Sequence, residues 1–81
     1  MKNSSMTMNM YGVSNMTHFL EMVDRCSEPV FMLLGGETYN VREDSMLRRL
    51  LMQLSSGGEY KAALTLTFDR KDACSVMGFL A

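Results

Sequence analysis

The chain has few of the residues on which most metal and redox sites depend. Its 81 residues include one histidine, two cysteines, one proline and no tryptophan. Cys26 and Cys74 lie far apart and belong to no CxxC or Cys/His ligand spacing, so we interpret them as buried or half-buried free thiols in a reducing compartment. Scattered carboxylates and a single histidine predict no metal site, and no motif predicts a cofactor.

Strong charge and long apolar runs are also absent. The net charge is −1, and basic residues cluster only at Arg48 and Arg49, with Arg42 nearby. This is no electrostatic footprint for nucleic acid. No apolar run approaches the ~20 residues that span a bilayer, and the N-terminus lacks the apolar core of a signal peptide. We therefore expect a cytoplasmic protein with no membrane association.

Methionine is abundant, with ten residues, and apolar residues make up 47% of the chain. This composition is typical of a folded domain. Residues 1–5 are polar and are expected to form a disordered tail, with residues 6–81 forming a single domain. Most methionines fall at positions predicted to face inward, which favours a soft core over a methionine-rich binding surface.

The first half predicts a strand, a helix and a hairpin. Residues 6–11 alternate, placing three methionines on one face. A helix follows, capped by Ser14 or Asn15 and ended by Pro29. Residues 29–34 form a run too apolar for a strand with one face in water, and two glycines at 35–36 predict a tight turn to a strand over 38–41. The helix face predicted to be buried consists of Met16, Phe19, Leu20, Val23 and Cys26.

The second half predicts a helix, a strand and a final helix. Asp44 or Ser45 caps the first of these helices, residues 61–68 form the strand, and Asp69 caps the last helix. The predicted buried stripes are Met46, Leu47, Leu50, Leu51 and Leu54 in one helix and Ala73, Val76, Met77 and Leu80 in the other. The order βαββαβα predicts an α+β two-layer open-faced sandwich, with a four-stranded antiparallel sheet and three helices on one face.

Residues 11–18, Y-G-V-S-N-M-T-H, stand where the first strand passes into the first helix. A helix start presents unpaired N–H groups and a positive dipole end, so it can hold an anion. His18 follows Ser14 by four positions, so its imidazole can approach the serine hydroxyl and act as a base. The alternative is a capping serine and a surface or half-buried histidine.

The element order, Gly12-Val13 and the stretch Tyr39-Asn40-Val41-Arg42 resemble the histidine-containing phosphocarrier (HPr) of the bacterial sugar phosphotransferase system. The resemblance runs from about residue 6 to 80. In that family a Gly and an aliphatic residue precede the phosphorylated His, and an Arg and a Pro follow in the first helical turn. The corresponding residues here are Ser14 for the His, Met16 for the Arg and Thr17 for the Pro.

The resemblance implies a protein that is not an enzyme, has lost phosphocarrier activity and serves as a regulatory or protein-binding module. His18 is the one remaining imidazole that could carry phosphate. The family's regulatory serine corresponds to Ser45 if about two residues are inserted before it, and otherwise to Glu43. The expected partners are phosphotransferase-system or regulatory proteins, and the chain is expected to be a monomer or weak dimer. The expected partner surface joins the two helix starts and comprises Ser14, Asn15, Met16, Thr17, Leu47 and Arg48.

Two alternatives remain open. One is a regulator that still carries phosphate, on its histidine or on Ser45 near Arg48 and Arg49, where a helix start favours the charge. The other is a small ligand-binding domain of ferredoxin-like topology. Strand order separates the folds, because the phosphocarrier sheet places its last strand between the first two, whereas a ferredoxin-like sheet has its first and third strands at the centre.

Overall fold

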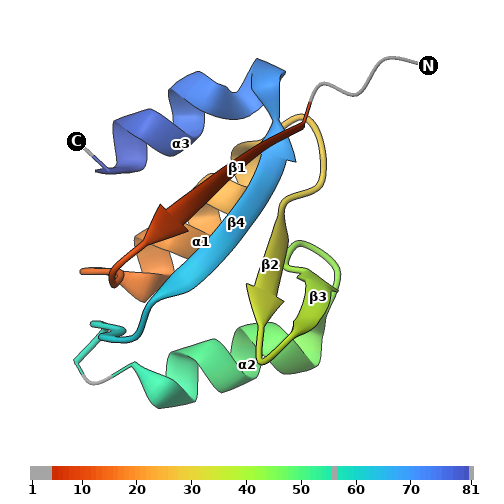
Figure 1. Cartoon of the computed structure of the whole chain (residues 1–81). Coiled ribbons are helices and arrows are strands. Elements are labelled where there is room, and N and C mark those ends of the chain that lie inside the picture. Colours follow the sequence, from red (N-terminus) through yellow and green to blue (C-terminus); the bar gives the residue numbers. More distant parts are fainter. Residues whose placement is uncertain (1–4, 56, 81) are drawn as a thin grey trace.

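A computed structural model describes residues 5–55 and 57–80, and for Leu80 the backbone only. The elements are β1 (Ser5–Met10), α1 (Met16–Arg25), β2 (Phe31–Leu34), β3 (Glu37–Asn40), α2 (Ser45–Leu54), β4 (Leu64–Asp69), the 3₁₀ turn η1 (Arg70–Asp72) and α3 (Ala73–Leu80). The predicted α+β class and βαββαβα order are confirmed (Figure 1). Ser5 belongs to β1 and not to the predicted tail, whose residues 1–4 lie outside the described part of the chain.

The sheet has the strand order β1-β4-β2-β3, and every neighbouring pair is antiparallel. The last strand therefore lies between the first two, with Leu66 of β4 opposite Met8 of β1 on one side and Met32 of β2 on the other. This is the order that the resemblance to the phosphocarriers implies. A ferredoxin-like sheet would have its first and third strands at the centre, so that alternative is wrong.

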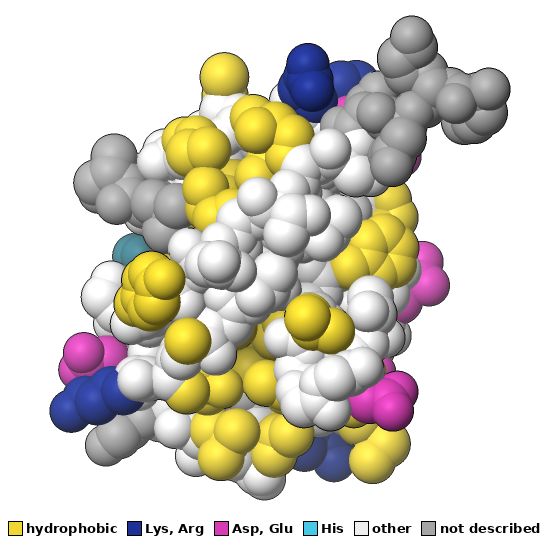
Figure 2. Space-filling model, viewed as in Figure 1, with side chains coloured by type: hydrophobic (Ala, Val, Ile, Leu, Met, Phe, Trp, Pro, Cys, Tyr) yellow, Lys and Arg dark blue, Asp and Glu magenta, His cyan; other side chains and the backbone are white. Residues whose placement is uncertain are grey.

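The strands separate a buried face from an open one. Met10, Leu64, Leu66 and Phe68 are buried, as the alternation in β1 and β4 predicts, and Met32 of β2 is buried with them. On the open face, polar side chains of β1 and β4 bond to each other: Thr7 Oγ1 lies 3.3 Å from Thr67 Oγ1, and the Thr65 hydroxyl donates to Asn9 Oδ1 at 2.8 Å. The band of the surface over these two strands is mostly white in Figure 2.

The prediction that residues 29–34 are too apolar to have a face in water is wrong. Met32 is buried, but Phe31 is 37% exposed and Leu33 is 45% exposed. The cause is the sheet itself, because alternate residues of a strand point to opposite faces and only one face is covered. β2 therefore places two large apolar side chains on the open face.

The inner face of α3 also differs from the prediction. Val76 is buried, and Phe79 packs on Phe19 with ring centroids 5.6 Å apart, while Met77 is exposed. The side chain of Leu80, also predicted for this stripe, lies outside the described part. Asp69 caps η1 and not α3, accepting the N–H of Lys71 at 2.8 Å. A 3₁₀ turn has 3.0 residues per turn, so it shifts the phase of the helix that follows.

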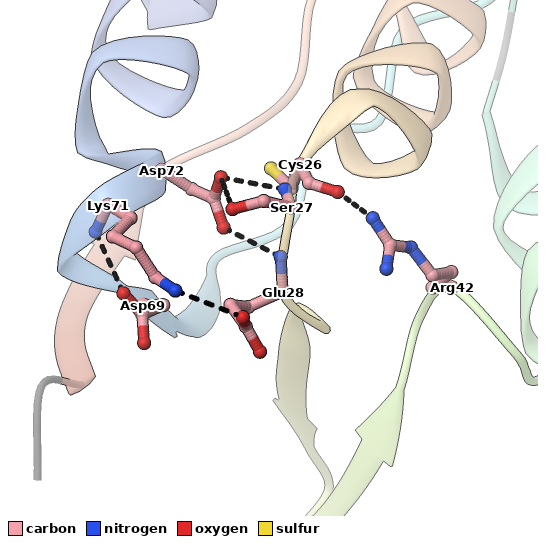
Figure 3. Close-up of polar contacts among 7 residues, drawn as sticks. All are labelled: Cys26, Ser27, Glu28, Arg42, Asp69, Lys71 and Asp72. Atoms are coloured by element: carbon pink, nitrogen blue, oxygen red, sulfur yellow. Dashed lines mark hydrogen bonds and ion pairs between the residues drawn. The ribbon is translucent and has the colours of Figure 1, made fainter.

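Asp72 is a buried carboxylate that ties the start of α3 to the connection between α1 and β2 (Figure 3). Its oxygens accept the Ser27 N–H at 2.8 Å, the Ser27 hydroxyl at 3.0 Å and the Glu28 N–H at 3.1 Å. Burial alone would raise the pKa of this carboxyl, but these hydrogen bonds outweigh it, and the pKa is lowered. The charge of Asp72 is therefore part of the folded structure.

The sulfur-containing side chains divide between core and surface. Cys26 is buried, as expected, and burial raises the pKa of its thiol. Cys74 is exposed, so the expectation of a buried or half-buried thiol is wrong for this residue. Of the methionines predicted to face inward, Met10 and Met16 are buried, Met6 and Met8 are partly buried, and Met46 and Met77 are exposed. Met22 and Met32, for which the patterns predict no inner face, are buried too.

Candidate functional site

The start of α1, the predicted anion site, is held in place by the loop that precedes β4. Gly12 has φ 135°, and Val13, which is buried, exchanges backbone hydrogen bonds with Tyr60 at 2.7 and 2.8 Å. A Cβ at position 12 would stand 3.1 Å from the Tyr60 carbonyl oxygen. Glycine is therefore required at this position both for its backbone conformation and for the close approach of the loop.

Most N–H groups that could hold an anion at this helix start already have partners. Asn15 is the N-cap, and its Oδ1 accepts the His18 N–H at 3.1 Å. The Met16 N–H donates to the Gly58 carbonyl at 2.7 Å. Among the N–H groups of Met16, Thr17 and His18, only that of Thr17 has no partner among the described residues. The helix start therefore has little capacity left for phosphate oxygens.

Ser14 and His18 are both exposed, and no hydrogen bond joins their side chains in the described part of the chain. Both line a shallow recess between α1 and α3, together with Glu21 and Arg25. Among residues 5–55 and 57–80, no third side chain bonds to the imidazole, whereas activation of a serine requires an oriented base. The alternative of a capping serine and a surface histidine holds for His18, which is exposed, but not for Ser14, because Asn15 is the N-cap.

Met16 and Leu47 contribute little or nothing to the outer surface. Met16 is fully buried and Leu47 is 5% exposed, so both belong to the core. The predicted role of Met16 in partner binding is wrong, because its side chain has no exposed surface, whereas Leu47 keeps a small exposed part. Ser14, Asn15 and Thr17 are exposed, as a contact surface requires.

Arg48 is also engaged within the chain. Its guanidinium binds Asp24 through two hydrogen bonds of 2.9 and 2.8 Å and donates to the Val41 carbonyl at 3.2 Å. Arg48 thus lies near the end of α1, whereas the loop after α2 contacts Met16 at its start. α1 and α2 therefore run antiparallel, and the two predicted parts of the partner surface lie at opposite ends of this helix pair. With a rise of 1.5 Å per residue, the start of α1 and Asp24 are about 12 Å apart along the helix.

Ser45 is exposed and is the first residue of α2. Asp44 is the N-cap, and its carboxylate accepts the Leu47 N–H at 2.9 Å. A phosphate on Ser45 would meet the positive end of the helix dipole but also the carboxylate of Asp44. Since Arg48 is paired with Asp24, Arg49 is the basic side chain that remains exposed near this position.

A further functional candidate was missed by sequence reasoning: the outer surface of α2. Leu47 and Leu51 are buried, but Met46 is 80% exposed and Leu50 is 42% exposed, so the predicted buried stripe is wrong in part. Leu54, also predicted for that stripe, is exposed, as is Met52. Figure 2 shows hydrophobic side chains gathered along the lower side of the molecule, where α2 lies. Met46, Leu50 and Leu54 follow one another at intervals of four residues and so lie on one side of the helix, and we call their exposed side chains the α2 patch.

An open groove of about 490 Å³ runs beside the α2 patch, between α2 and the β2–β3 hairpin. Its lining is mainly apolar, with one carboxylate and one guanidinium: Leu34, Tyr39, Asp44, Met46, Leu47, Arg49, Leu50 and Gln53. A signal was present in the sequence. Six of the ten residues of α2 are Met or Leu, which is more than one face of a helix packed on a core can bury.

Other kinds of site receive no support within residues 5–55 and 57–80. No cluster of three or more histidine, cysteine, aspartate or glutamate side chains is placed to hold a metal ion there. None of the helices described is long and apolar enough to cross a bilayer. No known protein family, no curated protein and no solved structure matches the chain.

Proposed function

We propose that the chain is a cytoplasmic HPr-like protein that carries no phosphoryl groups and serves as a protein-binding or regulatory module. The strand order β1-β4-β2-β3 supports the relationship, as does the Gly12-Val13 connection that leads directly into α1. Ser14 stands in the position of the phosphorylated imidazole. The proposed partners are proteins of the phosphotransferase system or its regulation.

The loss of carrier chemistry is supported by the start of α1. A serine hydroxyl is a poor nucleophile without an activating base, and its phosphoester does not transfer as a phosphoimidazole does. The nearest histidine, His18, makes no hydrogen bond with Ser14, and Gly58 and Asn15 already accept helix N–H groups that would otherwise meet phosphate oxygens. Such a helix start stabilises the fold but offers few free N–H groups to bind a phosphoryl group during transfer.

The single observation that carries a binding role is the α2 patch. Exposed large apolar side chains that adjoin a groove mark interaction sites, because covering them removes apolar surface from water. Arg49 at the rim of the groove can pair with an acidic side chain. The favoured partner is therefore a protein segment with apolar side chains spaced to enter the groove and an acidic residue near Arg49.

Phosphotransfer provides the first test. The chain is incubated with phosphoenolpyruvate and the pathway's phosphoenolpyruvate-dependent enzyme, with an authentic phosphocarrier as the positive control. We expect acid-labile phosphate on the control and none on this chain, as measured by intact mass at neutral pH. Stable incorporation at His18 would contradict the loss of carrier activity.

Site-specific photocrosslinking tests the binding surface. A photoreactive amino acid replaces Met46 in one variant and Thr38, an exposed residue of β3, in a matched control. Protein adducts in the source cells should form at position 46 and not at position 38, and Leu50→Lys should abolish them. Equal adducts at both positions, or adducts that survive Leu50→Lys, would remove the α2 patch from the proposal.

Phosphorylation of Ser45 is a second candidate, favoured by the exposure of this residue at the first position of α2. The phosphate would be attracted by the helix dipole and Arg49, and repelled by Asp44. Intact mass after treatment with the family's serine kinase is the test, with Ser45→Ala as the control. A chain that gains no mass is not a substrate, and this candidate would be removed.

A further inference from the structure

The two edges of the sheet differ in how they are protected against pairing with another strand. Figure 1 shows β1 and β3 on opposite sides of the sheet. β3 has four residues and carries Glu37, and a short charged edge discourages pairing. β1 has six residues, S-M-T-M-N-M, with neither a charge nor a proline. Its register with β4 runs without a bulge from Ser5 to Met10.

Residues 6–10 of β1 have backbone groups on their outer side with no partner among the described residues. In an antiparallel pair, alternate residues direct their N–H and C=O groups toward one neighbour, and the remaining residues direct theirs away from it. Within the described part of the chain, no backbone hydrogen bond reaches the outer side of residues 6–10. An edge of this length without charge, proline or bulge is a template for a further strand.

We propose that a second copy of this chain pairs with β1 in antiparallel fashion, so that two sheets join into one. A two-fold axis at Met8 places Met6 opposite Met10 of the second copy and Thr7 opposite Asn9 of the second copy. Antiparallel neighbours share a face, so this register sets methionine against methionine and polar against polar side chains. It also covers Met6 and Met8, which are only partly buried in the single chain.

The identical strand fits this edge for three reasons. A two-fold interface must be self-complementary, and the alternation of β1 gives that match on both faces at once. The strand has no charge that would be repelled by its own copy. The groove beside α2 is lined by β2, β3 and α2 residues, away from β1, so each copy keeps its α2 patch free. The inference is independent of the proposed function.

Sedimentation of the full chain from micromolar to millimolar concentration tests the pairing. We expect a concentration-dependent dimer and, from hydrogen exchange, protection of the β1 amides that increases with concentration. Thr7→Lys/Asn9→Lys places like charges opposite each other across the proposed pair and should raise the dissociation constant about tenfold or more. Thr38→Lys, which adds a charge to the other edge, is the matched control and should leave the dimer unchanged.

Three results would overturn the proposal. One is a wild-type chain that stays monomeric over the whole concentration range. This includes the case in which an added peptide protects the β1 amides but a second copy of the chain does not. Another is a dimer that the lysine pair does not weaken or that Thr38→Lys weakens equally. The third is a dimer whose β1 amides gain no protection. This last measurement uses the wild-type chain, so it decides the matter even if the lysine variant fails to fold.

Discussion

α1 and α2 are helices of equal length with different tasks. Each has ten residues, and each is capped by a side-chain oxygen, from Asn15 in one and Asp44 in the other. α1 buries Met16, Phe19, Leu20, Met22 and Val23, whereas α2 buries only Leu47 and Leu51. α1 contacts both other helices, and α2 leaves its apolar side chains beside an open groove. An amphipathic sequence therefore predicts that one face of the helix is apolar. It does not predict whether that face is covered by the protein's own core or stays exposed.

The strongest test of this contrast compares Phe19 with Leu50. Phe19→Ala removes a fully buried ring that packs on Phe79, and the loss should be about 3–5 kcal/mol. Domains of this size have total stabilities near the low end of about 5–15 kcal/mol, so this variant should be left with a marginal stability of about 0–2 kcal/mol. Leu50→Ala should cost less than about 1 kcal/mol, because the side chain is already 42% exposed. Urea unfolding followed by circular dichroism measures both, and similar costs would refute the difference between the helices.

The second prediction concerns how the two helices end. Asp72 fixes the residues that follow α1, whereas Ser55 after α2 donates to Leu51 within the same helix. Asp72→Asn should cost about 1.5–3 kcal/mol, because hydrogen bonds to a buried charge are lost. A variant as stable as the wild type would show that the carboxylate is dispensable.

The same carboxylate predicts a pH dependence. Its folded pKa is lowered below the ordinary value of 3.8, so the unfolded chain binds the proton more tightly. The contribution of Asp72 is therefore complete above pH 3.8 and is lost as the pH falls through the folded pKa. Urea midpoints measured at falling pH should decrease less steeply for Asp72→Asn than for the wild type. Parallel decreases would assign the acid sensitivity to other carboxylates.

The sequence identifies the fold better than the site, for reasons visible in particular residues. Alternation in β1 and β4 and two glycines at 35–36 suffice for the strands, because these signals are local. The exposure of the outward side of β2 and of the α2 patch depends on which elements cover each face. A local sequence pattern contains no information about that covering. Leu50 and Leu51 have the same chemistry, yet one is 42% exposed and the other fully buried. The hydrogen bonds that Asp72 accepts from Ser27 and Glu28 join positions 45 and 44 residues apart, so no local pattern predicts them.

The third prediction compares the two caps. Asn15→Ala and Asp44→Ala each remove an oxygen that accepts a helix N–H, at 3.1 and 2.9 Å, so each should cost about 1 kcal/mol. The loss should be similar in both helices even though their burial differs, since capping acts on the first turn alone. Urea midpoints at neutral pH provide the comparison. A cap that matters only in α1 would mean that α2 forms independently of its N-cap.

The smallest expected effect lies where α1 and α2 meet. Arg48→Ala removes an ion pair with Asp24 and a bond to the Val41 carbonyl, but the Asp24 side chain is 50% exposed, so the cost should be about 0.5–1 kcal/mol. Arg49→Ala is the neighbouring control and should change stability by less than about 0.5 kcal/mol, because Arg49 is exposed. Since salt screens exposed charges, the difference between the two variants should narrow in concentrated sodium chloride. Equal losses at low salt would show that the ion pair does not couple the two helices.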